Sequence, residues 1–299
     1  MEDRYRALVN GQGKACSLVV LPSRKDGHGP GFARNVGVAH STEEYIAFLD
    51  DDDLWIDPDH LRRVSEIIEA TESLGPRADL LLARQVAWRE GRPMEVPMWL
   101  DPVMDIIAGR SFDGIPHGAA RVGVAELMQA GGFGFAHLNT LIVSRSLFDA
   151  VGGFDEGLYY EGDRDLYLRL VDHARSIWFL PHVVARHNVP DPQGLPTAST
   201  SVGQLEKLLY QQRIFEKAIL FSRHAEVRKH ARRRKVVVLK QLAGAVRSQG
   251  RHRLALAYAA EALGAAPTFK WTGATVLYAM RALGGARGSR EKDDSGNTA

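Results

Sequence analysis

Cysteine and long apolar runs are the scarcest features of the sequence. The single cysteine, Cys16, excludes an internal disulfide framework and a cysteine-based zinc site, and it suits a reducing compartment. No stretch approaches the roughly 18 consecutive apolar residues of a membrane-spanning helix, and residues 1–15 lack the apolar segment of a secretory signal. We therefore expect a cytoplasmic protein with no transmembrane segment, for which peripheral membrane contact stays open.

The chain also has little net charge. The chain has 38 Lys and Arg residues against 36 Asp and Glu residues, so its overall electrostatics argue against a nucleic-acid partner. For the basic run at residues 228–235, RKHARRRK, a solvated helix face is favoured over contact with an anionic surface. With 299 residues, 45% of them hydrophobic, the chain can form one large domain with an appendage.

Short apolar runs alternate with helical patterns in the first half of the chain. This alternation predicts an α/β fold with a mixed, mostly parallel sheet flanked by helices. The expected strands are residues 17–21, 45–49, 79–88, 140–145 and 176–187, the last broken at Pro181. The expected helices are residues 32–39, 58–73, 146–154 and 163–172.

The remaining segments complete the expected domain organisation. Residues 89–135 are rich in Gly, Pro and Met and predict loops and short helices inserted near the active face. Gly and Pro residues up to Thr200 predict a mobile loop, and from Ser201 the pattern is helical. We therefore expect an α/β domain at residues 1–200, a helical C-terminal extension at 201–290 and a disordered tail at 291–299.

Four consecutive carboxylates, Asp50 to Asp53, directly follow the strand expected at residues 45–49. Like charges this close repel one another, so a cation would offset the cost of placing them together. Ligands bind at the carboxyl ends of strands in open α/β sheets, and carboxylate oxygens suit Mg²⁺ or Mn²⁺. The cluster predicts a divalent metal that bridges aspartates to a diphosphate, with an exposed acidic turn before a helix as the alternative.

The segment around this cluster, GPGFARNVGVAHSTEEYIAFLDDDDLWIDPDHL, resembles glycosyltransferase family 2, in which an ARN-type helix precedes a strand ending in a DXD motif. The resemblance implies the GT-A fold of nucleotide-diphospho-sugar transferases and a bound Mg²⁺ or Mn²⁺ ion. Asp50 and Asp52 would form the DXD pair that holds the metal, with Asp52 the more direct ligand. Asp50 and Asp51 would contact the donor, and Arg34 and Asn35 would lie on its nucleotide side.

A second segment, VGGFDEGLYYEGDRDLYLRL, resembles the GGFDE stretch of the same family and the acidic motif that follows it. Asp163 stands where the family has its general base, which accepts the proton of the acceptor hydroxyl. The glutamate that precedes this base in the family is replaced by Gly162, and Glu161 lies one position earlier. The alternative is that Asp163 only starts a helix, although one carboxylate can serve both purposes.

A histidine beyond the last core strand often completes the metal site in GT-A enzymes, and His187 falls at that place. An ordinary polar loop residue is an equal alternative for His187. The residues His117, His137 and His182 have no such context, and we expect them to be structural.

The resemblance covers residues 18–187 and departs from the family at its start. Family members normally begin with a strand–helix–strand unit whose acidic strand end binds the nucleotide base, and no such segment precedes Phe32. We expect either a start codon assigned too late or a shortened member in which donor binding is weak or lost.

The sequence thus predicts an inverting, metal-dependent glycosyltransferase that transfers a sugar from a nucleotide-diphospho-sugar to an acceptor hydroxyl. The acceptor would be a carbohydrate or lipid-linked molecule in cell-surface polysaccharide or glycoconjugate synthesis. The alternative is a shortened, catalytically idle GT-A module that binds a partner through its C-terminal helices. A metal-dependent phosphatase is disfavoured because Asp53 and Leu54 stand where its signature needs Thr or Val.

Overall fold

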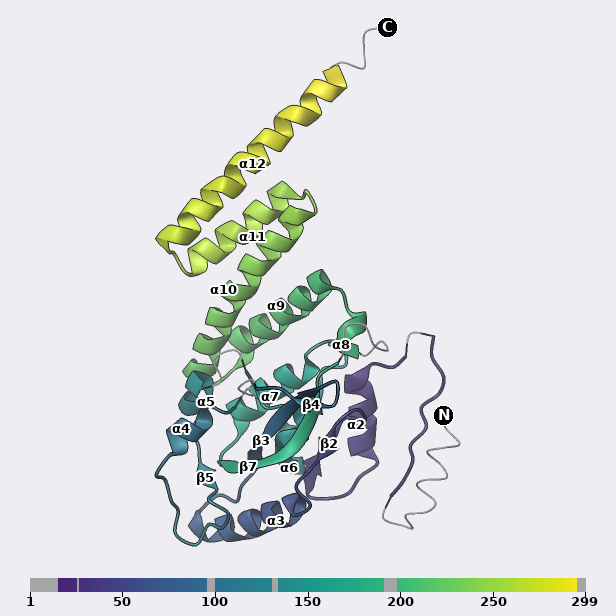
Figure 1. Ribbon diagram of the computed structural model, residues 1–299, viewed down its shortest axis with the longest axis vertical. Helices are drawn as coiled ribbons and strands as arrows, with labels where there is room; N and C mark the ends of the chain where they lie inside the picture. Colours follow the sequence, from purple (N-terminus) through teal and green to yellow (C-terminus); the bar gives the residue numbers. More distant parts are fainter. Residues whose placement is uncertain (1–15, 26, 96–99, 131–133, 191–197, 295–299) are drawn as a thin grey trace.

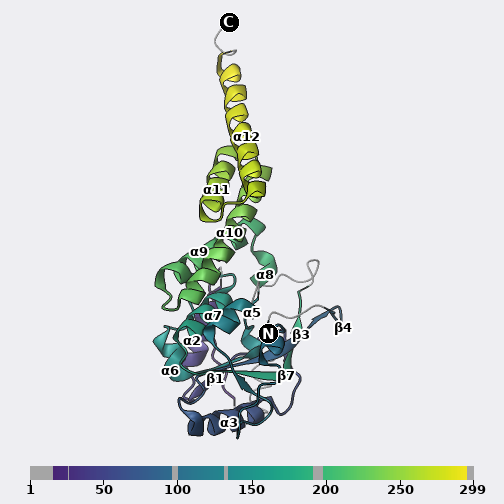
Figure 2. The same cartoon turned by 90° about the vertical axis from the view of Figure 1, so that its left-hand side faces the viewer.

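The computed structural model describes residues 16–25, 27–95, 100–130, 134–190 and 198–294. All strands of the described chain lie in one α/β part at the bottom of Figure 1, and helices α9 to α12 rise from it as a narrow column. Figure 2, turned by 90°, shows the sheet between two layers of helices and the column above them.

Seven strands form one sheet with the order β1-β6-β3-β7-β2, in which β4 pairs with β3 and β5 with β7. The two longest strands, β3 and β7, are apolar over most of their length and lie side by side at the centre. The strands are β1 (Tyr45–Ala47), β2 (Leu54–Trp55), β3 (Leu80–Arg89), β4 (Arg92–Pro93), β5 (Ala120–Arg121), β6 (Leu141–Ser144) and β7 (Ile177–Asn188).

The mixed sheet confirms the expected fold class, but the expectation of mostly parallel pairing is wrong. Among the described strands only β3 and β7 pair in parallel, and every other pairing is antiparallel. The sequence pattern suggested a parallel crossover for each helix, whereas several short turns and the inserted residues 89–135 return the chain in the opposite direction. Antiparallel neighbours bring the end of one strand next to the beginning of another.

The two faces of the sheet are covered by different helices. Along β3, Leu80 and Leu82 belong to the larger core and Leu81 and Ala83 to the smaller one, as the two-residue period of a strand requires. The smaller core packs on α3, below the sheet in Figure 2, and the larger core packs on α7 and α9. The helices of the α/β part are α2 (Pro30–Ala39), α3 (His60–Thr71), α4 (Val103–Ile107), α5 (Val124–Ala130), α6 (Arg145–Ala150) and α7 (Gly162–His173), with 3₁₀ turns η2 (Glu72–Leu74) and η3 (Leu138–Thr140).

The apolar run at residues 17–21 is not a strand, contrary to expectation. It forms no ladder, and the Val20 side chain is 45% exposed. The edge strand β1 pairs with β6 alone among the described strands, and in Figure 1 the purple segment after residue 15 runs beside the α/β part. Hydrophobic periodicity misled here because an apolar run contains no information about whether another strand is available to pair with it.

Strand β7 continues through Pro181, where a break was expected. The ladder with β3 shifts register at this point, since Leu82 lies opposite Phe179 and Arg84 opposite Val183. A proline has no N–H to donate to the ladder, so a bulge accommodates it without ending the strand.

The C-terminal helices are α8 (Ala198–Ser201), α9 (Gln204–Phe221), α10 (Ala225–Ser248), α11 (His252–Ala265) and α12 (Phe269–Asp294). Phe215 of α9 and Ala231 of α10 are fully buried in the larger core of the α/β part. The second half of α10 instead forms a separate cluster with α11 and α12, which includes Val246 and Tyr278. The proposed boundary near residue 200 stays a prediction.

The carboxylate of Asp172, at the end of α7, holds the start of α10 in place. It accepts hydrogen bonds from the backbone N–H groups of Arg223 and His224, at 2.7 and 2.8 Å. Of the segments expected to be irregular, residues 191–197 and 295–299 lie outside the described residues, and residues 291–294 belong to α12. No helix in the described part of the chain is long and apolar enough to cross a membrane.

Candidate functional site

Three segments that are distant in the sequence meet beyond the end of β1. The chain leaves β1 and turns through Asp50 to Asp53 before it enters β2. Because β6 runs antiparallel to β1, with Ile142 opposite Ala47, the residues just before β6 lie beside this aspartate turn. Strand β2 pairs with the last residues of β7, which brings His187 to the same place.

Asp53 is the buried anchor of this arrangement. Its Oδ1 accepts the backbone N–H of Asn188 at 2.6 Å, and its Oδ2 accepts Asn139 Nδ2 at 2.5 Å and His187 Nδ1 at 2.9 Å. Burial favours the neutral acid, but the hydrogen bonds and the charge of His187 lower the pKa of Asp53 below its ordinary value. Both carboxylate oxygens are therefore already used to join β7 and η3 to the turn.

His187 is oriented by its contact with Asp53. An ionised carboxylate can only accept, so the proton lies on Nδ1 of His187 and a neutral ring keeps the lone pair of Nε2 available to a ligand. Burial opposes the charged ring, but the hydrogen bond with Asp53 and the charges of Asp53, Asp52 and Asp50 raise the pKa of His187. A carboxylate behind a histidine in this way is the usual support of a histidine that binds a metal.

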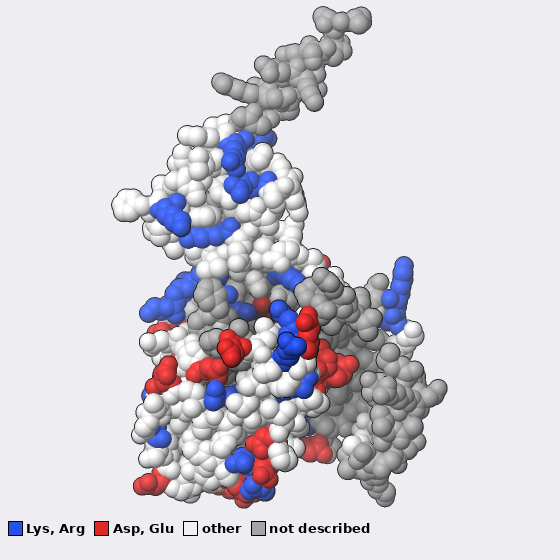
Figure 3. All heavy atoms as spheres, viewed as in Figure 1, with Lys and Arg blue, Asp and Glu red and all other residues white. Residues whose placement is uncertain are grey.

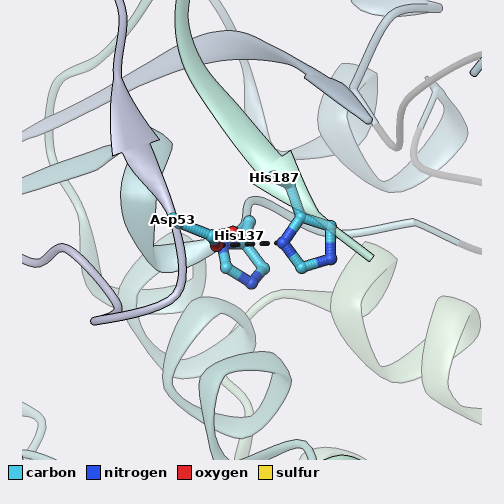
Figure 4. Close-up of side chains that lie close together, drawn as sticks. All are labelled: Asp53, His137 and His187. Carbon is cyan, nitrogen blue, oxygen red and sulfur yellow. Dashed lines mark hydrogen bonds and ion pairs between the residues drawn. The ribbon is translucent and has the colours of Figure 1, made fainter. Parts of the chain in front are cut away.

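His137 is a further member of the site. Its ring centroid lies 4.7 Å from that of His187, and its Nε2 lies 3.8 Å from Asp50 Oδ2. Nitrogen or oxygen atoms of Asp53, His137 and His187 all fall within 4.8 Å of one another, and Figure 4 shows the two rings next to the Asp53 carboxylate. Burial lowers the pKa of His137, which favours the neutral ring that a metal needs.

Asp51 and Asp52 lie exposed at the tip of the aspartate turn, which is closed by a hydrogen bond from the Asp53 backbone N–H to the Asp50 carbonyl at 3.1 Å. Partial burial and the charges of Asp53 and Asp50 raise the pKa of Asp52. A cation beside Asp52 would remove this electrostatic penalty. Asp52 thus differs from Asp53, whose neighbouring donors already stabilise its charge.

The described residues therefore fit a divalent metal through two sets of side chains. The compact group Asp53, His137 and His187 has suitable atoms, but the three donors on Asp53 leave it little capacity as a direct ligand. Asp52 with His187 leaves Asp53 as the support of the histidine, which matches the hydrogen bonds in the structure. Among the described residues only the trio of Asp53, His137 and His187 brings ligand atoms within 4.8 Å of one another. Asp50 Oδ2 lies 3.8 Å from His137 Nε2, and Asp52 as a direct ligand stays a prediction.

Arg34 contacts the aspartate turn, and its expected place on the nucleotide side of a donor stays a prediction. Its Nη2 donates to Asp50 Oδ1 at 2.5 Å, and its guanidinium stands 5.5 Å from the centre of the Phe154 ring. Both groups are partly exposed, with 26% and 23% of the side chains of Arg34 and Asp50 accessible. The remaining N–H groups of a guanidinium in this position suit the phosphate oxygens of a donor.

The Asn35 amide is hydrogen-bonded to the loop after α6, and its expected place on the nucleotide side stays a prediction. Its Nδ2 donates to the Phe154 carbonyl at 3.0 Å and to Glu156 Oε1 at 2.9 Å, and its Oδ1 accepts the Phe154 N–H at 2.9 Å. The amide therefore clamps α2 to the loop after α6. This contact gives a structural reason for the ARN and GGFDE segments to occur in the same chain.

Asp163 lies in the first turn of α7, where its Oδ1 accepts the N–H of Arg164 at 2.9 Å. The Asp163 carboxylate is close enough to His137 for its charge to oppose the lowering of the His137 pKa by burial. The carboxylate is partly exposed. Both expected roles, helix start and base, are therefore compatible with its position.

Glu161, which lies one position earlier than the glutamate of the family motif, is largely buried and contacts the C-terminal helices. Glu161 adopts a left-handed backbone conformation, with φ 54° and ψ 32°, and its side chain is 12% exposed. It pairs with Arg164 at 2.7 Å and accepts a hydrogen bond from Gln211 of α9 at 2.8 Å. Burial raises the pKa of Glu161, opposed by Arg164 and Gln211. This residue joins α7 to the C-terminal helices and does not replace the glutamate of the family motif.

Sequence reasoning missed His137 and Asn139 as members of the site. His137 was expected to be structural, and Asn139 was not singled out. A signal did exist, since both lie immediately before an apolar run that forms β6. It could be interpreted only with the knowledge that β6 is antiparallel to β1, because a parallel strand would place these residues at the opposite edge of the sheet.

Comparison with known proteins finds one family model that matches the N-terminal part of the chain. The model of glycosyl transferase family 2 matches residues 3–92, which contain α2 and the aspartate turn. The match confirms the resemblance of the segment that contains Arg34 and Asp50 to Asp53, and it supports a glycosyltransferase. No curated protein matches the sequence.

Solved structures of TarS from S. aureus share the fold of this chain. TarS 1-349 in complex with UDP-GlcNAc superposes with a TM-score of 0.57 at 17% identity, over 89% of this chain and 70% of that chain. TarS 1-349 alone gives 0.55 at 16% identity, over 89% and 68%, and the longer TarS structure 0.52 at 16%, over 89% and 40%. The likeness establishes the GT-A fold.

Proposed function

We propose that the chain is an inverting, metal-dependent glycosyltransferase that uses a nucleotide-diphospho-sugar donor. The observation that supports the proposal is the meeting of the aspartate turn with His137 and His187, together with an Asp163 carboxylate near enough for its charge to act on His137. This arrangement combines groups for a diphosphate and its cation with a separate carboxylate for the acceptor. The UDP-GlcNAc bound to TarS 1-349, which has the same fold, supports a nucleotide-sugar as donor.

The metal site would consist of Asp52 and His187, with Asp50 and His137 beside them. When bound there, Mg²⁺ or Mn²⁺ would neutralise charge on the departing nucleoside diphosphate. Asp53 holds Nδ1 of His187, so Nε2 would be the atom that binds the ion. Arg34, now paired with Asp50, would exchange part of that contact for donor phosphate oxygens.

Asp163 would act as the general base. Its carboxylate accepts the proton of the acceptor hydroxyl while the acceptor oxygen forms a bond to the anomeric carbon, and the bond from that carbon to the diphosphate oxygen breaks. Attack from the face opposite the leaving diphosphate inverts the configuration. The transition state has oxocarbenium character, as in glycoside hydrolysis. The acceptor proposed is a carbohydrate or lipid-linked hydroxyl in polysaccharide or glycoconjugate synthesis.

The substitution Asp163→Asn tests this function directly. It keeps the size of the side chain but removes the proton acceptor, so transfer should fall by about a hundredfold or more, with donor affinity nearly unchanged. UDP- and GDP-sugars with Mn²⁺ would be titrated calorimetrically, and transfer measured by release of the nucleoside diphosphate. Asp149→Asn, at an exposed carboxylate of α6, is the matched control and should change neither quantity.

Two results would contradict the proposal in different ways. Loss of donor binding together with transfer in Asp163→Asn would remove the base assignment. The absence of heat with every donor would instead favour the alternative of an idle GT-A module that binds a partner.

A further inference from the structure

The near-neutral net charge of the chain conceals a strong separation of charge. We define the C-terminal lobe as residues 222–283, which contain α10, α11 and the first part of α12. This lobe holds 13 Lys and Arg residues against 2 acidic residues, a net charge of +11. Residues 1–221 hold 22 against 31, a net charge of −9, and residues 284–299 hold three of each sign. The positive charge is therefore concentrated on the column of helices.

Most of these cations are accessible. Of the two acidic residues in the lobe, Glu261 is paired with Lys235 at 2.8 Å, and Glu226 is only partly exposed. Figure 3 shows Lys and Arg side chains spread over this face of the α11–α12 part with no acidic side chains among them, whereas acidic groups gather on the α/β part. The exposed cations are Arg223, Lys229, Arg232, Arg233, Arg247, Arg251, Arg253, Lys270 and Arg281.

Helix α12 adds an exposed apolar stripe to the same lobe. One side of this helix packs on α11 through Tyr278, which is 8% exposed. Phe269, Val276, Met280 and Leu283 fall on the opposite side at helical spacing. Phe269 is fully exposed, and Leu283 and Met280 are 72% and 62% exposed. Apolar side chains of this size, unpartnered on a described helix face, indicate a surface that another body covers.

A cavity between α9, α10 and α11 has the same mixed character. Its volume is about 430 Å³, and its apolar lining includes Ile219, Val236 and Leu239. Arg232 and Arg233 also line it, together with a single acidic residue. An apolar cavity bordered by arginines suits an anionic amphiphile.

We infer that the C-terminal lobe docks the protein on an anionic membrane surface. Cations and exposed apolar side chains on one helical module match the two parts of such a surface, acidic headgroups and acyl chains. A second copy of the lobe is a poor occupant because two bodies of charge +11 repel each other. A nucleic acid would use the cations but leave the apolar stripe of α12 in water. The contact is peripheral, and it does not depend on the reaction proposed for the α/β part.

Flotation of the full chain with lipid vesicles tests this inference. The protein should float with vesicles that contain about one third phosphatidylglycerol in phosphatidylcholine, and not with phosphatidylcholine alone. Binding should weaken as salt screens the cations. The binding assay is separate from sugar transfer, so its outcome does not depend on the success of the functional proposal.

Two variants on α12 separate the apolar and the charged contribution. Phe269→Ser with Met280→Ser should weaken vesicle binding by about tenfold or more, because two exposed apolar side chains no longer enter the membrane. Lys270→Gln with Arg281→Gln should weaken it by roughly fivefold per charge. Leu61→Ser with Leu74→Ser is the matched control, since these leucines of the α/β part are 53% and 49% exposed; its binding should equal that of the parent.

Three results would overturn the inference. The first is the absence of the parent from the vesicle fraction at low salt. The second is equal vesicle binding by both α12 variants and the parent, each with an unchanged thermal midpoint. The third is a parent dimer in analytical ultracentrifugation that Phe269→Ser with Met280→Ser dissociates, because the stripe would then be covered by a second copy.

Discussion

The four adjacent aspartates differ more from one another than their shared sequence context suggests. Asp53 is 5% exposed and accepts three hydrogen bonds. The Asp52 residue is exposed, and partial burial of its carboxylate together with the charges of Asp53 and Asp50 raises its pKa. Asp50 pairs with Arg34. Three of the four identical residues thus differ: Asp53 is a buried anchor, Asp52 an exposed carboxylate and Asp50 one half of an ion pair.

Asp52→Asn and Asp53→Asn should therefore have opposite effects on stability. Asparagine has one oxygen and one NH₂ group, so in Asp53→Asn the NH₂ group would face hydrogen-bond donors from which the carboxylate now accepts. We expect this substitution to lower the free energy of unfolding by about 2 kcal/mol. Asp52→Asn removes an exposed carboxylate from a repulsive cluster and should leave stability unchanged or slightly higher. Both should weaken Mn²⁺-dependent donor binding, which calorimetry measures alongside urea unfolding. A stable Asp53→Asn that loses Mn²⁺ dependence would instead make Asp53 a direct ligand.

Helix α2 and the loop after α6 are held together by close backbone approach as well as by Asn35. Gly153 has φ 64°, and a Cβ there would lie 2.8 Å from Asn35 Oδ1. Its neighbour Gly152 has φ 78°, but a Cβ would meet nothing within 4 Å. Substitutions at these two glycines therefore distinguish two effects on stability: strain of a side chain at positive φ, which both would have, and steric overlap with Asn35, which only the substitution at Gly153 would have.

Gly152→Ala should lower stability by about 1 kcal/mol, because alanine is strained at positive φ. Gly153→Ala should cost about 1–3 kcal/mol more, since the added methyl group also overlaps Asn35. The displaced helix carries Arg34, so donor affinity should fall in Gly153→Ala alone. Urea unfolding and donor titration of the two variants provide the comparison. If Gly152→Ala and Gly153→Ala had equal free energies of unfolding, the close approach to Asn35 would not contribute to stability.

The positions of most helices and strands could be predicted from the sequence, whereas the direction in which the strands pair could not. Local signals located α2, α3, α7 and the strands of the core, because helix starts and apolar runs depend on neighbouring residues. Strand direction depends on residues far apart in the chain, so the antiparallel neighbours of β1 and β7 were not foreseen. The membership of His137 and Asn139 depends on that direction. The roles expected for Asp163, Asp50 and His187 come from motifs, which do not require the topology, and they stay predictions.

The junction between the α/β part and the positively charged C-terminal lobe contains a buried histidine, His230, beside several arginines. His230 of α10 is buried between α10 and α5, where its Nδ1 lies 3.3 Å from the Met128 carbonyl. Burial, with the charges of Arg234, Arg233 and Arg164, lowers the pKa of His230 to about 4, against the opposing effect of the Met128 carbonyl. The folded protein therefore keeps this ring neutral at a pH at which the unfolded chain protonates it.

This junction should make the molecule sensitive to mild acid. The unfolded chain binds a proton near pH 6.5 and the folded chain only near pH 4, so the free energy of unfolding falls as the pH drops through this range and levels off below it. Between pH 7 and pH 5 the contribution of His230 should be about 2 kcal/mol. His230→Gln keeps a side-chain donor for the Met128 carbonyl but cannot titrate, so it should lose that much less stability than the parent over the same range. Urea unfolding at both pH values measures the difference, to which other groups contribute equally in the two proteins. Parallel pH profiles would mean that His230 is protonated in the folded state, and that the junction tolerates a further positive charge among its arginines.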